Sequence, residues 1–134
     1  MSSDSRIELI SPKSIHRPAG YSHVAKVHAG TLLFIAGQVA LDRTGTLVGS
    51  GDFTAQARQV FANLKLAVEA AGGSFRNIVK LNVYVLDAAR IPEYREVRDQ
   101  YVDIDHPPAS TAVQVVAFVG PEFLLEVEAV AVLP

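Results

Sequence analysis

Residues 52–71 constrain the fold more than any other part of the chain. Asp52 is suited to cap a helix, and apolar residues then recur at helical spacing until Gly72 and Gly73 end the pattern. The apolar stripe consists of Phe53, Ala57, Val60, Phe61, Leu64, Val68 and Ala71, while Gln56, Arg58, Gln59, Asn63 and Lys65 are expected to face solvent. A long helix with one apolar side is typical of a helix that packs on a sheet, so we expect a layered α+β structure.

The segments that follow predict three strands and a second helix. Residues 79–85 alternate between apolar and polar side chains, the period of two that indicates a half-buried strand. Pro92 suits the first turn of the helix, and the Pro107-Pro108 pair ends any helical tendency. The predicted elements are a strand at 79–85, a helix at 91–102, and strands at 111–118 and 124–133 that a Gly-Pro turn separates.

The N-terminal part of the chain predicts a short edge strand followed by a β-hairpin. Ile7–Ile10 suits an edge strand, which Ser11-Pro12 interrupts. Val24–Val27 and Leu32–Ala36 are short apolar runs, and Gly30 between them can adopt the positive φ of a tight turn. We therefore expect these two runs to pair. The whole chain is predicted to be one domain over residues 1–134, with a disordered tail at residues 1–6 and two helices on one face of a mixed sheet.

Composition argues against several functional classes. The chain has 12 basic and 14 acidic residues and a net charge of −2, without the basic excess typical of nucleic-acid binding. It has no cysteine, and its four histidines lack metal-ligand spacing. No stretch approaches the roughly 20 apolar residues of a membrane span. We expect a cytoplasmic protein without metal or cofactor, which binds neither nucleic acid nor membranes. Only 19% of residues are charged, so we also expect other subunits to cover some apolar surface.

Short motifs between residues 21 and 129 resemble the Rid family of reactive intermediate deaminases, also called YjgF or endoribonuclease L-PSP proteins. They are Tyr21-Ser22, residues 33–38 (LFIAGQ), Gly51-Asp52, Asn63-Leu64, residues 70–73 (AAGG), residues 79–81 (VKL), residues 83–85 (VYV) and residues 126–129 (EVEA). The resemblance implies a chorismate-mutase-like fold and a homotrimer that binds a small molecule in clefts between its subunits. It also implies hydrolysis of imine or enamine intermediates such as 2-aminoacrylate.

The resemblance assigns roles to individual residues. Tyr21 matches the tyrosine that lines the cleft, and Ala36 and Gly37 match the segment whose backbone amide faces the ligand. Glu126 matches the glutamate that positions the attacking water. Glu126 and Tyr21 are therefore the candidate catalytic residues, and Ala36 and Gly37 are candidate substrate-binding residues.

Ser110 departs from the family pattern. Where the family has a Pro-Ala-Arg-Ser run, this chain reads Pro-Ala-Ser-Thr over residues 108–111. The planar guanidinium of the missing arginine grips a carboxylate through two charge-assisted hydrogen bonds, which a serine does not reproduce. Arg90 and Arg17 are the candidate replacements, and the alternative is that both are solvated surface arginines. Ser110 and Thr111 would instead hydrogen-bond a neutral ligand, or only bond locally at the start of a strand.

Three functional hypotheses follow from the sequence. The first is a trimeric imine or enamine deaminase with a substrate other than 2-aminoacrylate. The second is a non-catalytic ligand-binding or regulatory trimer. The third is the endoribonuclease or translation-inhibitor activity that older descriptions of the family suggest, which the mildly acidic charge disfavours.

Overall fold

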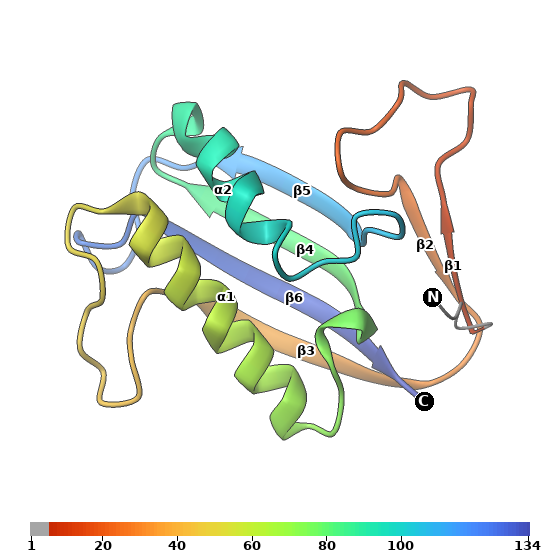
Figure 1. The fold of residues 1–134 in the computed structure, drawn as a ribbon, viewed down its shortest axis with the longest axis horizontal. Helices are drawn as coiled ribbons and strands as arrows, with labels where there is room; N and C mark the ends of the chain where they lie inside the picture. The colour runs from red at the N-terminus through yellow and green to blue at the C-terminus, as the bar shows by residue number, and fades with distance from the viewer. Residues whose placement is uncertain (1–5) are drawn as a thin grey trace.

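The computed structural model describes residues 6–134, and its main feature is a four-stranded mixed sheet (Figure 1). In their order across the sheet, the strands are β3 (Thr31–Gln38), β6 (Leu125–Leu133), β4 (Ile78–Val85) and β5 (Ala109–Gln114). Strand β6 is antiparallel to both β3 and β4, whereas β5 is parallel to β4. The longest strand, β6, therefore lies inside the sheet.

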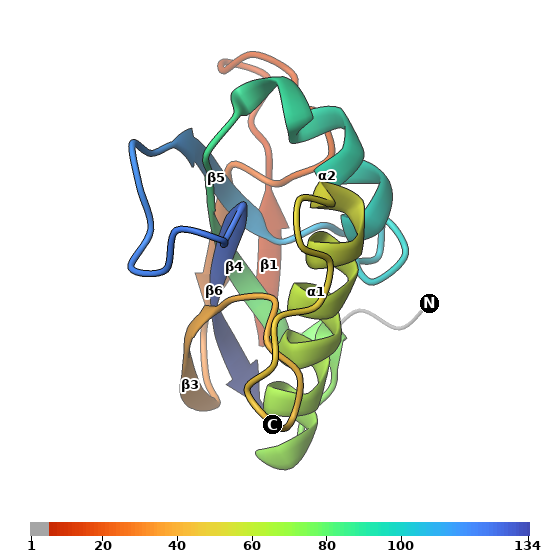
Figure 2. The same ribbon diagram turned by 90° about the vertical axis from the view of Figure 1, so that its left-hand side faces the viewer.

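Both α-helices lie on the same side of this sheet (Figures 1 and 2). Helix α1 spans Phe53–Ala70 and helix α2 spans Ile91–Arg98. Asp52 caps α1 as predicted, because its carboxylate accepts a hydrogen bond from the Ala55 amide at 3.1 Å. Short 3-10 turns, η1 (Phe75–Asn77) and η2 (Ala88–Arg90), precede β4 and α2. The predicted class, a mixed sheet with two helices on one face, is confirmed.

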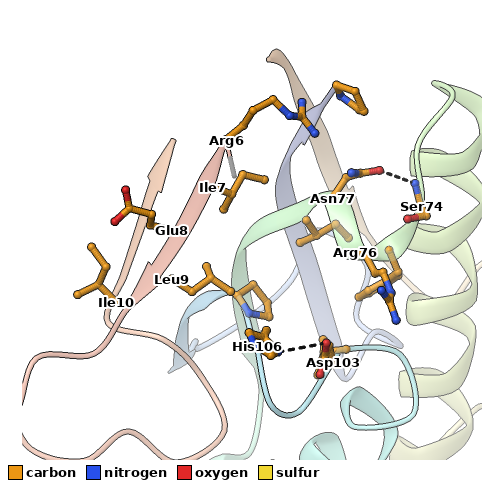
Figure 3. A pocket seen from close by; sticks show the side chains of 15 residues that line it. Arg6, Ile7, Glu8, Leu9, Ile10, Ser74, Arg76, Asn77, Asp103 and His106 are labelled. Carbon is orange, nitrogen blue, oxygen red and sulfur yellow. Dashed lines mark hydrogen bonds and ion pairs between the residues drawn. The ribbon is translucent and has the colours of Figure 1, made fainter. Parts of the chain in front are cut away.

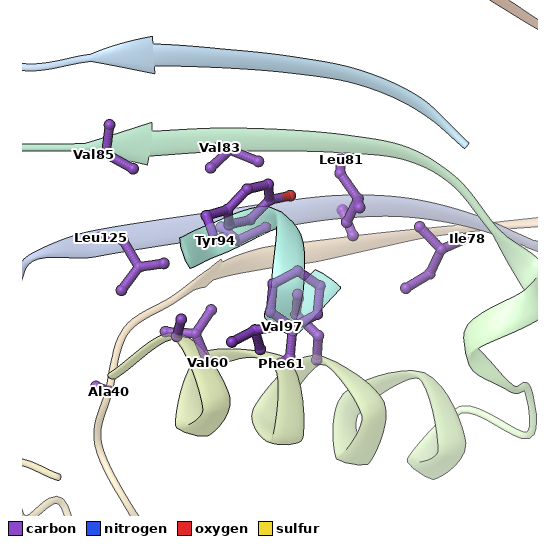
Figure 4. Packing of buried hydrophobic residues seen from close by; sticks show 14 of the residues in the cluster. Ala40, Val60, Phe61, Ile78, Leu81, Val83, Val85, Tyr94, Val97 and Leu125 are labelled. Atoms are coloured by element: carbon purple, nitrogen blue, oxygen red, sulfur yellow. The ribbon is translucent and has the colours of Figure 1, made fainter. Parts of the chain in front are cut away.

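The core lies between the helices and the face of the sheet that they cover (Figure 4). Phe61 of α1, Tyr94 of α2 and Leu81 of β4 are all buried there. Along β6, Leu125 and Val127 point to the same side, as the alternation in the sequence predicts. Neither helix covers the other face, which we call the open face (Figure 2).

The predicted β-hairpin is wrong. Strand β2 (Val24–Val27) pairs with β1 (Ile7–Ile10) in a separate antiparallel ribbon, and β3 pairs with β6. Gly30 has the expected positive φ of 129°, but a β-carbon at this position would collide with the Leu133 carbonyl oxygen. The glycine therefore allows the chain to pass close to the end of β6. Pairing with the nine-residue β6 gives β3 a longer ladder than the four-residue β2 offers.

Two elements end four residues before their predicted last residue. Helix α2 ends at Arg98 instead of Val102, and the chain continues in hydrogen-bonded turns such as that from the Tyr101 amide to the Arg98 carbonyl. Strand β5 ends at Gln114 because its parallel partner β4 ends at Val85, the residue that pairs with Gln114. The end of β5 is thus decided by its neighbouring strand.

Of the predicted disordered tail at residues 1–6, only Arg6 lies within the described residues. Residues 1–5 of the predicted tail lie outside the described residues, whereas Arg6 is half-buried and its carbonyl accepts a hydrogen bond from the His28 amide at 2.7 Å.

The prediction that Gln56 faces solvent is wrong, because its side chain is 0% exposed. Its amide hydrogen-bonds backbone groups of two loops, which explains why a polar residue is buried on α1.

Candidate functional site

Gly37 and Glu126 lie together on the open face of the sheet. The β3–β6 ladder is irregular between Ile35 and Gln38, so that Ala36 and Gly37 form a β-bulge. The Glu126 carboxylate lies against Gly37, and a β-carbon on residue 37 would collide with its Oε2 atom. A side chain at position 37 would therefore displace the carboxylate from its place. The structure brings Ala36, Gly37 and Glu126, three of the predicted site residues, side by side.

Tyr84 and Glu128 adjoin this group on the same face. Tyr84 of β4 pairs with Glu126 across the sheet, and its hydroxyl donates a hydrogen bond to Glu128 Oε1 at 2.9 Å. This hydrogen bond raises the pKa of Tyr84 above its ordinary value, and burial and the charges of Glu128 and Glu126 add to the effect. Tyr84 therefore stays protonated and remains a hydrogen-bond donor beside Glu126.

Ser110 and Thr111 point to opposite faces of β5. Ser110 pairs with Leu81, whose side chain is in the core, so the serine faces the helix side. Thr111 faces the open side, where its hydroxyl accepts a hydrogen bond from Lys80 Nζ at 2.9 Å. Strand β4 separates β5 from β6, which places either residue at least two strand spacings, about 9–10 Å, from Glu126. Within one chain, Ser110 and Glu126 do not form a common site.

Tyr21 lies in the loop of residues 11–23, which is attached to the segment leading into β5. The Ser22 amide donates to the Pro108 carbonyl at 3.0 Å, and the Ser22 hydroxyl donates to the Pro107 carbonyl at 2.6 Å. The Tyr21 ring meets the His23 ring edge-on, with centroids 5.4 Å apart. These contacts place Tyr21 near the start of β5, the strand that carries Ser110.

Of the two candidate arginines, only Arg17 lies near Tyr21 in the folded structure. Arg17 and Tyr21 line the same cavity, which has a volume of about 480 Å³. Arg90 is exposed in η2, beyond the opposite end of β4, and its Nη1 atom donates to Glu93 Oε1 at 2.8 Å. The structure thus places Arg17 beside Tyr21 and Arg90 in a surface ion pair.

A larger cavity of about 560 Å³ lies between β1 and η1 (Figure 3). Ile7 lines one wall, and Arg76, Asp103 and His106 lie on the opposite side. His106 Nδ1 is 3.5 Å from Asp103 Oδ2. The pKa of Asp103 is lowered from its ordinary value, and the main cause is the hydrogen bond from the Asp105 amide. None of the site residues predicted from the sequence lines this cavity.

The histidines are dispersed over the described part of the chain. His28 pairs with Glu8 at 2.5 Å, and His16 and His23 contact each other in the loop of residues 11–23. Among residues 6–134, no group of three or more His, Asp or Glu side chains is arranged to hold a metal ion. In the same range, no helix is long and apolar enough to cross a membrane.

The fold and the site define an α+β protein with one helix-covered sheet face and an open face that holds a glutamate against a glycine bulge. A family model described as endoribonuclease L-PSP matches residues 12–133. The chain belongs to this family, which confirms the resemblance to Rid and YjgF proteins inferred from the motifs.

Relatives with known sequences or structures match over nearly the whole chain. A RutC family protein of Pyrococcus horikoshii is 39% identical over 92% of this chain and 96% of the relative. The 3-aminoacrylate deaminase RutC of Acinetobacter baylyi is 30% identical over 90% of this chain and 98% of the relative. The crystal structure of the Rid family protein YyfB from Yersinia pestis, a protein of unknown function, has a TM-score of 0.86 at 34% identity and covers 96% of this chain and 99% of its own.

Sequence reasoning missed Tyr84 and Ser22 as parts of the site. Tyr84 is a polar position in an alternating strand, and only the register of β4 against β6 places it beside Glu126. Ser22 is buried, 6% exposed, because it joins the loop of residues 11–23 to Pro107 and Pro108. No local pattern in the sequence indicates either contact, since both depend on residues more than 40 positions away.

Proposed function

We propose that this chain forms a homotrimer, binds a small metabolite in clefts between its subunits and hydrolyses an imine or enamine other than 2-aminoacrylate. The observation that carries the proposal is the contact between Gly37 and Glu126, which holds a carboxylate on a sheet face that neither helix covers. The 30% identity to a protein named 3-aminoacrylate deaminase supports this class of reaction.

The division of the site within one chain supports clefts between subunits. Glu126 lies on the open face, whereas Tyr21 and Ser110 lie at the edge formed by β5. In the proposed trimer, the second copy packs on the open face with its own β5 edge toward Glu126 of the first copy, which joins the two halves of the site. The open face also presents Leu32 and Phe34 of β3, which are 55% and 80% exposed, and burying such apolar side chains favours association.

The proposed reaction needs a water, a base and a hydrogen-bond donor. Glu126 accepts a proton from the water while the water oxygen bonds to the imine carbon, and Glu126 then passes this proton to the imine nitrogen. Glu126 next transfers the hydroxyl proton of the resulting carbinolamine to its amine nitrogen, the C–N bond breaks, and ammonia leaves a carbonyl behind. One imine and one water thus give one carbonyl compound and one ammonia, while the backbone at Ala36 and Gly37 hydrogen-bonds the polarised group.

Glu126→Gln tests the proposal directly. With imines generated in solution by an amino-acid oxidase, we expect ammonia release to fall by roughly a hundredfold, the usual contribution of a positioned general base. Glu128→Gln is the matched control, because it changes a carboxylate on the same face of β6 but keeps an oxygen for the Tyr84 hydroxyl. Equal ammonia release by wild type and Glu126→Gln refutes the role assigned to Glu126.

Ser110→Arg tests the interpretation of the missing arginine. Loss of one partner from a charged pair at an interface costs roughly 2–4 kcal/mol, so wild-type turnover of 2-aminoacrylate is expected to be weak. The variant is expected to turn over 2-aminoacrylate faster than wild type. Wild-type turnover equal to that of relatives with an arginine at this position contradicts the interpretation.

A second candidate function is a non-catalytic ligand-binding or regulatory trimer, which the serine at position 110 favours. Measurable ligand binding without turnover over a panel of imines would support it. Endoribonuclease activity, which the family description names, is less favoured because the net charge is −2. RNA cleavage that persists in a Glu126→Ala, Tyr21→Phe double variant would point to another site or to contamination.

A further inference from the structure

One edge of strand β1 has no partner strand. Within the described part of the chain, β1 pairs with β2 alone, and the His28 amide donates to the Arg6 carbonyl at 2.7 Å. Antiparallel strands exchange hydrogen bonds at every second position, so this register points the peptide groups of Ile7 and Leu9 away from β2. Among residues 6–134, no hydrogen bond uses the main-chain N–H or C=O of either residue. The edge therefore offers two donors and two acceptors.

The cavity of about 560 Å³ adjoins β1 over the whole length of the strand, because all of residues 6–10 line it. Figure 3 shows the side chains of Ile7 and Leu9 pointing toward the cavity and those of Glu8 and Ile10 pointing away. Glu8 and Ile10 therefore line it with their main chain. The apolar part of the opposite wall consists of Phe75, Ile78, Val102 and Pro108. A strand added beside β1 thus finds apolar surface for every second side chain.

Glu8 decides which kind of strand fits this edge. If β1 of a second copy bonded to the same free groups, the two Glu8 carboxylates would stand directly opposite each other, and like charges in that position oppose pairing. Strand β2 avoids this conflict, because it places Lys26 opposite Glu8, between Ala25 and Val27. The His28 ring contacts only Oε1 of Glu8, which leaves Oε2 for a second cation. The edge therefore favours a partner strand in which a basic residue lies between two apolar ones.

We propose that β1 binds an extended peptide segment of another protein as a third, antiparallel strand, with a basic side chain opposite Glu8 and an apolar side chain on each side of it in the cavity. A two-stranded ribbon is only marginally stable by itself, and a third strand with an apolar face stabilises it. Hydrogen bonds to the main chain of Ile7 and Leu9 provide affinity, while the cavity selects the alternate side chains. No residue of the proposed catalytic site lines this cavity, so the inference is independent of the proposed reaction.

The blocked peptide acetyl-Thr-Val-Lys-Val-Thr-amide is a suitable probe. Amide hydrogen exchange of the full-length protein, followed by NMR, is expected to slow at Ile7 and Leu9 when the peptide is added. Exchange at Glu8 and Ile10 should change little, because their amides already bond to β2. N-methylation of both valines is expected to weaken binding about tenfold or more, since it removes two hydrogen bonds to β1. N-methylation of the lysine is the matched control and should leave binding unchanged, because that amide points away from β1.

The charge requirement is tested with variants of the protein. Glu8→Gln is expected to weaken binding of the lysine peptide about threefold, the contribution of one cross-strand charge pair. Glu69→Gln is the matched control, because Glu69 is also an exposed acid in an ion pair, with Lys65 on α1. This control should bind the peptide as wild type does. Replacing the lysine of the peptide by glutamate should weaken its binding to the wild-type protein.

Several results would overturn the inference. They are unchanged exchange at Ile7 and Leu9, equal binding of the two N-methylated peptides, equal effects of Glu8→Gln and Glu69→Gln, or equal binding of the lysine and glutamate peptides. Protection of Ile7 and Leu9 that rises with protein concentration in the absence of peptide would show that a second copy covers the edge instead. None of these measurements reads ammonia release, so they stand or fall separately from the proposed reaction.

Discussion

The ring and the hydroxyl of Tyr94 have opposite effects on stability. The ring is buried in the core, where it packs against Phe61 with centroids 5.7 Å apart and lies under the Arg98 guanidinium at 6.0 Å. The hydroxyl is buried as well, yet it has no hydrogen-bond partner among residues 6–134. Burial raises the pKa of Tyr94 above its ordinary value, because the ionised form is poorly solvated there.

Tyr94→Phe is therefore expected to stabilise the protein. Removing an unpaired buried hydroxyl should raise the free energy of unfolding by about 1 kcal/mol at neutral pH.

Above roughly pH 10, Tyr94 ionises in the unfolded chain but keeps its proton in the folded one, so wild-type stability falls as the pH rises. The variant should lose less stability over this range. Urea unfolding at pH 7 and at roughly pH 10.5 measures both effects, with Tyr101→Phe, a half-buried tyrosine of the same aromatic cluster, as the control. A variant less stable than wild type at neutral pH contradicts the interpretation.

At the scale of elements, Gln56 links helix α1 to two loops. Its Nε2 atom donates to the Gly49 and Glu122 carbonyls, both at 3.0 Å, and its Oε1 atom accepts from the Leu124 amide at 2.9 Å. The helix itself was predictable, because its cap and apolar spacing are local properties of residues 52–71. The burial of Gln56 was not predictable, because two of its three partners lie more than 60 residues away.

Gln56→Leu should fill the same space but leave three backbone groups without partners. We expect the free energy of unfolding to fall by about 2–4 kcal/mol, because buried polar groups that lose their partners carry the full cost of desolvation. Gln59→Leu is the control on the same helix, since its side chain makes one hydrogen bond to Asn63 at 2.9 Å. Chemical denaturation gives both values. Similar losses for the two variants would show that Gln56 does not join the loops to the helix.

At the scale of the whole molecule, one face of the sheet is left without a covering layer. The helices bury the other face, while Phe34 of β3 remains 80% exposed on the open face. Domains are usually built from packed layers, and a sheet face with large apolar side chains is ordinarily covered. The proposed trimer supplies that cover and completes a site whose parts lie apart in one chain.

Phe34→Asp tests this assembly. A charge on the open face is expected to shift the protein from trimer to monomer in sedimentation experiments, because burying a phenylalanine contributes about 2 kcal/mol per chain and an unpaired carboxylate opposes it. Leu66→Asp is the matched control, since Leu66 is 65% exposed on α1, away from the open face. The trimer should persist in the control. A wild-type protein that sediments as a monomer would rule out the proposed clefts.

The sequence alone determined the features that depend on neighbouring residues. Helix α1 with its Asp52 cap, strand β4 with its period of two, the alternation along β6, and the family itself were all predictable, because propensity, capping and motifs act over a few positions. Only the tertiary structure decided that β2 pairs with β1 and that Ser110 and Glu126 face opposite sides of the sheet. The same structure decided that Arg17, and not Arg90, lies beside Tyr21. Strand pairing and site geometry join residues far apart in the chain, and no local pattern encodes which distant partner gives the more stable contact.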